Sequence, residues 1–120
     1  MPGAPHARRT LTYSYGGRSM IIITGTVVID PTKRDEAIRI GCEHSARSRA
    51  EEGCVSHNCY FDAEDANRIH FFEQWRDMDA VQRHFAVPES GTFVQQIGGL
   101  AIIPPEISIF SAKPIEGAPF

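Results

Sequence analysis

The chain has 120 residues, of which 42% are hydrophobic and 22% charged, and its formal net charge at pH 7 is −3. This length fits one domain with its own core, and the charge argues against a nucleic-acid-binding surface, which needs clustered basic residues. No apolar run approaches the ~20 residues that span a bilayer, so a membrane protein is not expected. The odd number of cysteines, three, argues against a disulfide framework and favours reduced thiols in a cytoplasmic protein.

The first residues form a polar segment without a regular pattern. Residues 1–19 contain glycines, prolines and charges but lack the apolar centre of a secretory signal. They are therefore expected to be a flexible N-terminal extension. Residues 20–113 are expected to form the folded domain, and residues 114–120 a C-terminal tail.

The first two predicted elements are a strand and a helix. The β-branched run MIIITGTVVID at 20–30 is typical of a buried strand. Asp30 and Pro31 then favour the start of a helix, as its cap and its first residue. The helix should continue to about Glu51 and stop at Gly53. Its inner face is predicted to consist of Ile38, Gly41, Cys42 and Ser45.

A hairpin, a second helix and a last strand follow. The runs 54–62 and 68–76 alternate as strands do, and the polar sequence AEDAN between them predicts an antiparallel hairpin. A helix is expected over 77–87, with Asp77 as its cap and Pro88 beyond its end. Its apolar stripe would be Met78, Val81 and Phe85. Another short helix is expected within SGTFVQQIGGL, and a last strand at 105–112.

The order of the predicted elements is strand, helix, strand, strand, helix, strand. This order predicts an α+β fold of the ferredoxin-like type, βαββαβ, with an antiparallel sheet. The two helices would cover one face of the sheet, and the other face, which includes Phe72, would be bare in a monomer. Because apolar faces usually find a partner, a homodimer formed sheet to sheet is expected.

The predicted hairpin brings polar and aromatic residues onto one face. Pairing about the polar turn places residue 57 opposite 73, and a buried Glu73 needs a partner such as His57. His84, on the second helix, is expected at the edge of the same face. Mostly apolar walls with few polar groups are typical of small-molecule sites. The predicted cleft has walls of Phe71, Trp75 and Phe93 and contains His57, Glu73 and His84.

Structural interpretations of the same residues remain open at this point. They are Trp75 as plain core, Glu73 as the partner of Arg76, His57 as a hydrogen-bonded core residue and His84 as a surface residue. His44 and His70 are expected to be solvated or interfacial. Because His57, Glu73 and His84 include no ligand pair with the spacing of a metal site, no metal is predicted.

The sequences SRAEEGC (48–54) and DAEDANRIHFFEQWRDMDAVQRHF (62–85) resemble the antibiotic biosynthesis monooxygenase family of the dimeric α+β barrel superfamily. The family pattern is a helix ending in S-x-x-E-P-G-C, a hairpin, and then E-x-W-x-D-x-x-A-x-x-x-H. The positions that match are Ser48, Glu51, Gly53, Cys54, Asn67, Glu73, Trp75, Asp77, Ala80 and His84. The chain departs from common family residues at Glu52 (proline), His57 (tyrosine) and Glu89 (histidine).

The resemblance implies a monooxygenase without a cofactor that oxidises an aromatic quinol or phenol with O2. In such a site His84 or His57 would take or steer the phenolic proton, and Glu73 would orient a histidine. Trp75 and Phe71 would stack on the substrate. The alternatives are a non-catalytic dimeric module that binds a small molecule, and a haem-binding or haem-degrading relative. Haem-degrading relatives use an asparagine on the first strand, and MIIITGTVVI contains none.

Overall fold

The computed structural model describes residues 19–117. Almost all of the predicted extension over 1–19, and the end of the predicted tail, therefore lie outside the described residues. The strands are β1 (Met20–Val28), β2 (Cys54–Asp62), β3 (Asp65–Trp75) and β4 (Glu106–Ala112). The helices are the short 3-10 helix η2 (Pro31–Lys33), α1 (Arg34–Arg49), α2 (Met78–Ala86) and α3 (Pro88–Leu100).

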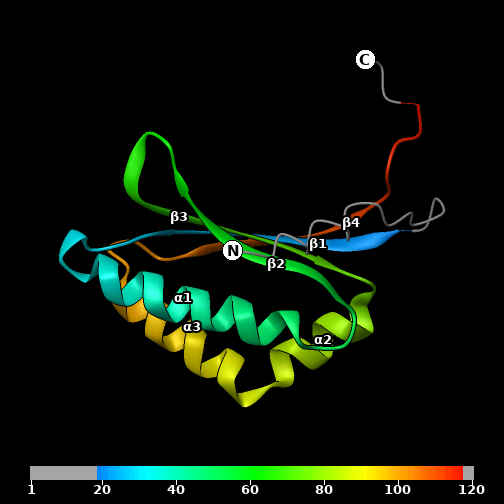
Figure 1. Cartoon of the computed structure of the whole chain (residues 1–120), viewed down its shortest axis with the longest axis horizontal. Helices are drawn as coiled ribbons and strands as arrows, with labels where there is room; N and C mark the ends of the chain where they lie inside the picture. Colours follow the sequence, from blue (N-terminus) through cyan, green and yellow to red (C-terminus); the bar gives the residue numbers. More distant parts are fainter. Residues whose placement is uncertain (1–18, 118–120) are drawn as a thin grey trace, which may run out of the picture.

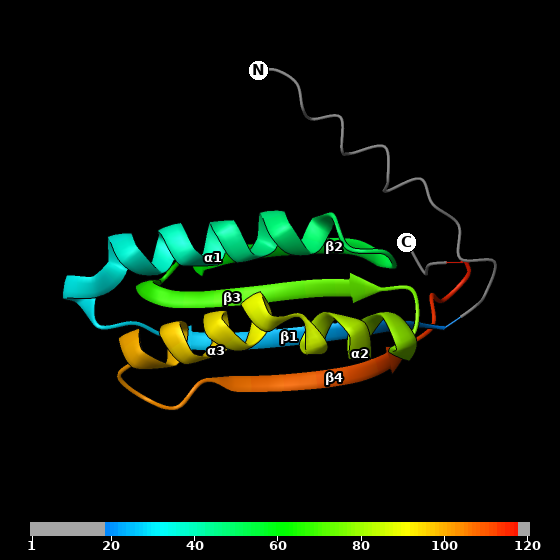
Figure 2. The same ribbon diagram turned by 90° about the horizontal axis from the view of Figure 1, so that it is seen from below.

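The strands form one four-stranded sheet in the order β2-β3-β1-β4, and every pairing is antiparallel. The helices α1, α2 and α3 all lie on one face of this sheet (Figure 1). Seen from the helix side, α1 runs along the β2 edge, α2 and α3 run along β1, and β4 is left uncovered (Figure 2). The fold is α+β and ferredoxin-like, as the order of predicted elements indicated. No helix in the described part is long and apolar enough to cross a membrane.

The ends of the helices depend on individual capping residues and on a glycine. Asp77 accepts a hydrogen bond from the Ala80 amide at 2.9 Å, which confirms it as the cap of α2. Asp30 accepts one from the Thr32 amide at 2.9 Å, but it caps the short η2, and α1 itself begins at Arg34 without a side-chain cap. Gly53 has a φ of +86°, and a Cβ there would lie 2.5 Å from the Ala80 Cβ. The turn after α1 therefore requires glycine, because it needs a left-handed backbone and has no room for a side chain.

The predicted hairpin register is confirmed over most of its length. His57 lies opposite Glu73, and Cys59 opposite Phe71. The register shifts between Cys54 and Ser56, so that Cys54 instead of Val55 lies opposite Trp75. Such a bulge puts one extra residue into one strand, and it corrects the predicted pairing at the end of the hairpin.

The predicted inner faces of the helices are partly wrong. Cys42 is exposed, and α1 instead buries Ala37, Ile40, Gly41, His44, Ser45 and Ser48. In α2, Met78 and Phe85 are 42% and 43% exposed, whereas Ala80, Val81 and His84 are buried. The close approach at Gly53 is consistent with this second correction, because it places the small Ala80 side of α2 against the turn after α1.

The interior has two apolar clusters. The larger one joins α1 and α3 to β1 and β3, and the smaller one joins α2 to the other end of the same strands. The members of the larger cluster are Val27, Ile29, Ala37, Ile40, Ile69, Phe71, Phe93, Ile97 and Leu100. The members of the smaller cluster are Ile21, Ile23, Trp75, Ala80 and Val81. Of the buried polar side chains described below, His57, Glu73 and His84 contact Trp75 of the smaller cluster.

Candidate functional site

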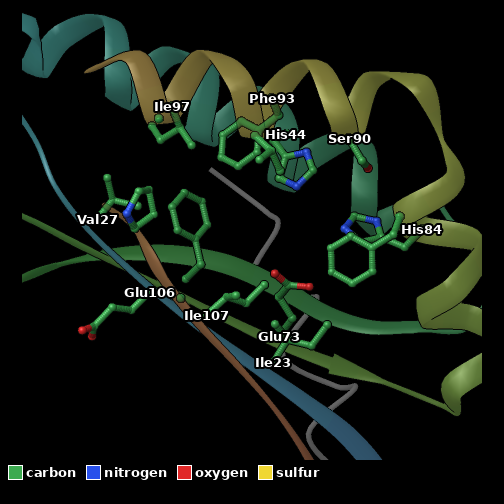
Figure 3. A pocket seen from close by; sticks show the side chains of 16 residues that line it. Ile23, Val27, His44, Glu73, His84, Ser90, Phe93, Ile97, Glu106 and Ile107 are labelled. Atoms are coloured by element: carbon green, nitrogen blue, oxygen red, sulfur yellow. The ribbon is translucent and has the colours of Figure 1, made fainter. Parts of the chain in front are cut away.

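A cavity of about 310 Å³ lies between the sheet and helices α2 and α3 (Figure 3). Most of its lining is apolar, and it includes the exposed side chains of Phe85, Val94 and Ile107. Its buried polar side chains are His44, Glu73, His84 and Ser90. Of the predicted site residues, Phe71, Phe93, Glu73 and His84 line this one cavity, whereas His57 and Trp75 do not.

Glu73 is a buried carboxylate with two partners. The Trp75 Nε1–H donates a hydrogen bond to Glu73 Oε1 at 2.9 Å, and His57 Nε2 lies 3.3 Å from Glu73 Oε2. Burial raises the pKa of Glu73, but the contacts with His57 and Trp75 outweigh it, and the net pKa is lowered. Glu73 is therefore an ionised group at neutral pH, with a carboxylate that faces the cavity.

His84 is 2% exposed, and its Nδ1 lies 2.8 Å from Glu51 Oε1. An ionised carboxylate can only accept a hydrogen bond, so we assign the ring proton of neutral His84 to Nδ1. Nε2 then carries a free lone pair. Glu51 was not predicted as a site residue. Its only sequence signal was its match to the family pattern at the end of the first helix.

Trp75 is fully buried and lies behind Glu73, where its ring centroid is 4.6 Å from that of His84. Because Trp75 is fully buried and does not line this cavity, the structure does not place the indole where the predicted stacking on a ligand requires it. His57 is also fully buried, and its Nδ1 lies 2.9 Å from the Ser45 hydroxyl. Both residues support the cavity wall from behind.

His44 is 4% exposed, which corrects the expectation that it is solvated or interfacial. Its ring stacks on Phe93 with the centroids 4.0 Å apart and the planes at 4°. Its Nδ1 lies 3.0 Å from an Arg47 guanidinium nitrogen. Burial, followed by the nearby His57 and His84, lowers the pKa of His44 to about 3, so its imidazole is neutral. His70, by contrast, is only half-buried and contacts Thr26 and Asp62 on the other face of the sheet.

Comparison with known proteins places this site within a family. The model of the antibiotic biosynthesis monooxygenase family matches residues 20–96, which include every polar site residue described above. The chain belongs to this family. An uncharacterized protein of Synechocystis sp. is 34% identical over 95 residues. That match covers 79% of this chain and 65% of the relative's length.

Solved structures agree on the fold. A Mycobacterium tuberculosis protein superposes with a TM-score of 0.73 at 22% identity, over 82% of this chain and 98% of the other. A structure described as an antibiotic biosynthesis monooxygenase superposes with a TM-score of 0.72 at 21% identity, over 78% and 99% of the two chains. These two structures show the fold, and the family is named for a monooxygenase activity.

Proposed function

We propose that the protein is a cofactor-independent monooxygenase that oxidises an aromatic quinol or phenol with O2. The observation that carries this proposal is the pairing of His84 with Glu51 at the wall of an apolar cavity. A phenol must lose its proton before its electrons become available to O2, and a histidine paired with a carboxylate is suited to accept that proton. The volume of about 310 Å³ lies at the lower end of the range for small-molecule pockets, about 300–1,000 Å³.

His84 acts as the general base in this proposal. Its Nε2 accepts the phenolic proton, while Glu51 stabilises the resulting imidazolium through Nδ1. The phenolate then reacts with O2 at an activated ring methylene group. One oxygen atom becomes a carbonyl on that carbon, and the other leaves as water with the two methylene hydrogens. The His84 imidazolium then returns its proton to the phenolate oxygen of the product. One methylene and one O2 thus give one carbonyl and one water, which balances without an external reductant.

The remaining side chains position the substrate. Phe71 and the stacked pair of Phe93 and His44 provide flat surfaces for an aromatic ring. The Ser90 hydroxyl is buried, lines the cavity and has no hydrogen-bond partner within the described residues. It is therefore available to a polar substituent of the substrate. Glu73, held by Trp75, is an ionised carboxylate at the same cavity wall as His84.

The proposal is tested by oxygen consumption with a panel of reduced quinols and anthrones. His84→Gln should lower kcat by about 10²–10⁴-fold, which is the usual contribution of a general base, and Glu51→Gln should lower it less. His70→Gln is the matched control, because His70 lies on the opposite face of the sheet. Unchanged turnover in folded His84→Gln would overturn the proposed role.

Binding without catalysis is the second candidate function, and the mainly apolar lining with exposed Phe85 and Val94 favours it. A thermal-shift screen with the same compounds separates the two, since a ligand that binds only the native state raises its stability. Stabilisation without oxygen uptake by any compound supports binding alone. Stabilisation together with uptake supports the enzyme.

We also propose a homodimer through the open face of the sheet. Tyr60, Phe72 and Phe110 are 54%, 37% and 52% exposed, and the strand registers place them on the face opposite the helices. Phe72→Glu should therefore convert a dimer to a monomer in analytical ultracentrifugation. Met78→Glu, at an exposed position on α2, should leave the mass unchanged. A monomeric parent chain would refute this proposal.

A further inference from the structure

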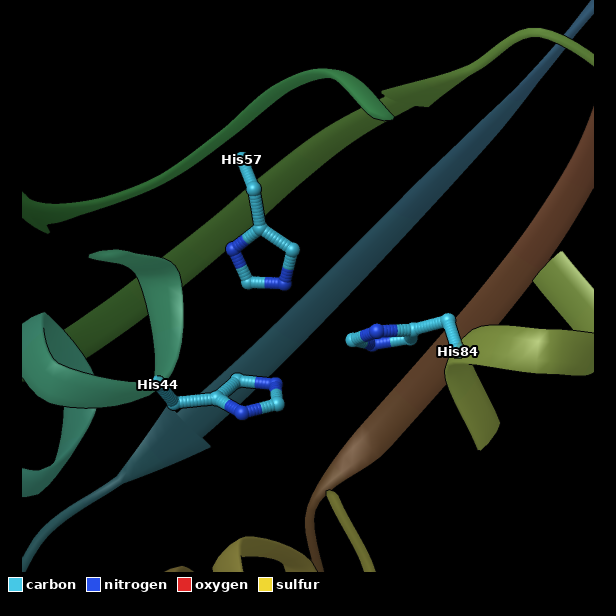
Figure 4. A group of neighbouring side chains, drawn as sticks. All are labelled: His44, His57 and His84. Carbon is cyan, nitrogen blue, oxygen red and sulfur yellow. The ribbon is translucent and has the colours of Figure 1, made fainter. Parts of the chain in front are cut away.

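Three buried histidines from three elements point toward one another: His44 from α1, His57 from β2 and His84 from α2 (Figure 4). One ring nitrogen of each can be chosen so that all three atoms lie within 4.8 Å of one another. The ring centroids are 4.9 Å, 5.4 Å and 5.6 Å apart. We propose that this histidine cluster (His44, His57 and His84) binds a divalent transition-metal ion such as Zn²⁺, Co²⁺ or Cu²⁺.

The hydrogen bonds around the histidine cluster select the ligand atoms. All three Nδ1 atoms have partners: Ser45 for His57, Glu51 for His84 and Arg47 for His44. The Nε2 atoms therefore remain as the ligands. When Ser45 and Glu51 accept from Nδ1–H, the Nε2 lone pairs of His57 and His84 are free for a metal. Such outer-shell acceptors are typical of metal-binding histidines.

His57 gives the clearest sign of a missing partner. Its Nε2 is buried and forms no aligned hydrogen bond with any described residue. The Glu73 carboxylate lies 3.3 Å away, so in the metal-free chain a proton on His57 Nε2 serves this poorly aligned contact, and a metal ion would take the place of that proton. A buried polar atom without an aligned partner carries a desolvation cost. A metal ion at Nε2 would remove that cost, and Glu73 and Glu51 would supply compensating negative charge.

The nitrogen ligands restrict which metal ions the site can bind. Imidazole nitrogens suit zinc, copper, nickel and iron, whereas calcium and magnesium require oxygen ligands. Tetrahedral coordination at about 2.0–2.1 Å places ligand nitrogens about 3.3 Å apart, so the rings must move closer together to bind. Since His44 and His84 line the cavity, a fourth coordination position would open into it.

Arg47 opposes metal binding through His44. A guanidinium only donates hydrogen bonds, so in its contact with Arg47 the His44 Nδ1 accepts and Nε2 carries the ring proton. His44 can coordinate through Nε2 only after Arg47 withdraws and the proton moves to Nδ1. Arg47 also donates to the Glu89 carbonyl at 3.3 Å, which offers it an alternative partner. Arg47 is thus inferred to set the affinity of the site.

The inference does not rest on the proposed oxidation. A metal at His84 Nε2 would occupy the lone pair that the proposed base uses, so the two proposals describe alternative states of the same histidine. Metal binding is measured without substrate. Its failure and the failure of the oxidation are therefore separate results.

The experiment is a titration of tag-free, chelator-treated full-length chain with Co²⁺, followed by the visible absorption that tetrahedral Co²⁺ shows, and with Zn²⁺ by calorimetry. The parent chain should bind one ion. Ser45→Ala should weaken binding by about 10–100-fold, as the loss of an outer-shell partner does, and His84→Gln should weaken it further. The controls His70→Gln and Cys42→Ser should bind as the parent does. Far-UV circular dichroism and metal-free melting establish that each variant is folded.

Arg47→Gln provides the sharpest test, because a glutamine oxygen can accept from His44 Nδ1–H where the guanidinium cannot. This variant should bind Co²⁺ more tightly than the parent chain, and the additional His44→Gln change should remove the gain. The proposal is overturned if neither the parent nor Arg47→Gln binds metal at micromolar concentration. It is equally overturned if binding survives His84→Gln but is lost in a control variant.

Discussion

The two ends of the helix–sheet interface are buried to a similar degree but are built from different groups. Toward Ile29, α1 and α3 pack on β1 and β3 through a large cluster of apolar side chains. Toward Trp75 it contains His44, His57, His84 and Glu73, each less than 9% exposed. We call the first region the apolar end, defined by the larger hydrophobic cluster, and the second the polar end, defined by the three histidines with Glu51 and Glu73.

The two ends differ in what they contribute: the apolar end stabilises the fold, and the polar end is suited to the chemistry of the cavity. Apolar burial stabilises a fold in proportion to the area removed from water, and it tolerates changes of identity. Buried ionisable groups lose hydration, and their mutual attraction often does no more than offset that loss. A contribution to stability therefore does not explain why these groups are buried at the polar end. They lie beside the cavity. Their arrangement is better explained by the chemistry of that cavity.

The largest expected effect lies at the apolar end. Ile29 is fully buried, and Ile29→Ala should lower the free energy of unfolding by about 2–5 kcal/mol, as other large-to-small core changes do. Urea denaturation measures this loss. Ile103→Ala, at an exposed loop position, is the control and should change stability by less than about 0.5 kcal/mol. If Ile29→Ala lowered the free energy of unfolding no more than Ile103→Ala does, the apolar end could not be described as the main source of stability.

The turn at Gly53, between α1 and β2, packs against Ala80 of α2. Gly53→Ala should cost about 1–3 kcal/mol for the left-handed backbone, and the clash with the Ala80 Cβ adds to it. Gly91→Ala in α3 is the matched change, because its Cβ would meet nothing within 4 Å. There alanine should stabilise the helix by up to about 1 kcal/mol. Thermal melting of the two variants measures these effects. If Gly53→Ala and Gly91→Ala shifted the melting temperature in the same direction, this account of the turn would be contradicted.

The geometry of the polar end was predictable only in part. The alternation of β3 and the polar turn fixed His57 opposite Glu73, because a strand has only two faces and the turn sets the register. The bulge near Val55 had no sequence signal, because alternation continues to read as a regular strand where one residue is added. His44 was misplaced because a polar residue on a helix is normally exposed. Its burial depends on stacking against Phe93, which belongs to a distant helix, and no local pattern records such a contact.

The Trp75–Glu73 hydrogen bond allows the coupling within the polar end to be measured. Trp75→Phe leaves Glu73 Oε1 without its donor and should cost more in the parent chain than in a Glu73→Met background. Groups in direct contact usually show coupling energies of about 0.5–3 kcal/mol. Ile23→Val replaces Trp75→Phe in the control cycle, because Ile23 belongs to the same small cluster but has no hydrogen bond to lose. Urea denaturation of both cycles gives the two coupling energies. A coupling no larger than that of the control would show that the hydrogen bond contributes nothing.

The smallest expected effect is a rate of cysteine alkylation, and it reports the charge of the polar end. Burial, followed by the negative charges of Glu73 and Glu51, raises the pKa of Cys54 to about 12. A raised pKa means less thiolate at a given pH, and the thiolate is the reactive form. At mildly alkaline pH, iodoacetamide should therefore modify exposed Cys42 first and Cys54 slowly, as measured by mass spectrometry of digested samples. Cys59, whose pKa is raised mainly by burial, reacts slowly for a different reason.

Glu73→Gln distinguishes these two causes. Removal of one negative charge should lower the pKa of Cys54 and speed its alkylation, whereas the rate at Cys59 should not change, since Glu73 does not contribute to the raised pKa of that thiol. Equal acceleration at both cysteines would indicate general loosening of the fold. No acceleration at Cys54 would mean that Glu73 carries no charge in the folded protein. That result would contradict the lowered pKa of Glu73 and, with it, the description of the polar end as a negatively charged site.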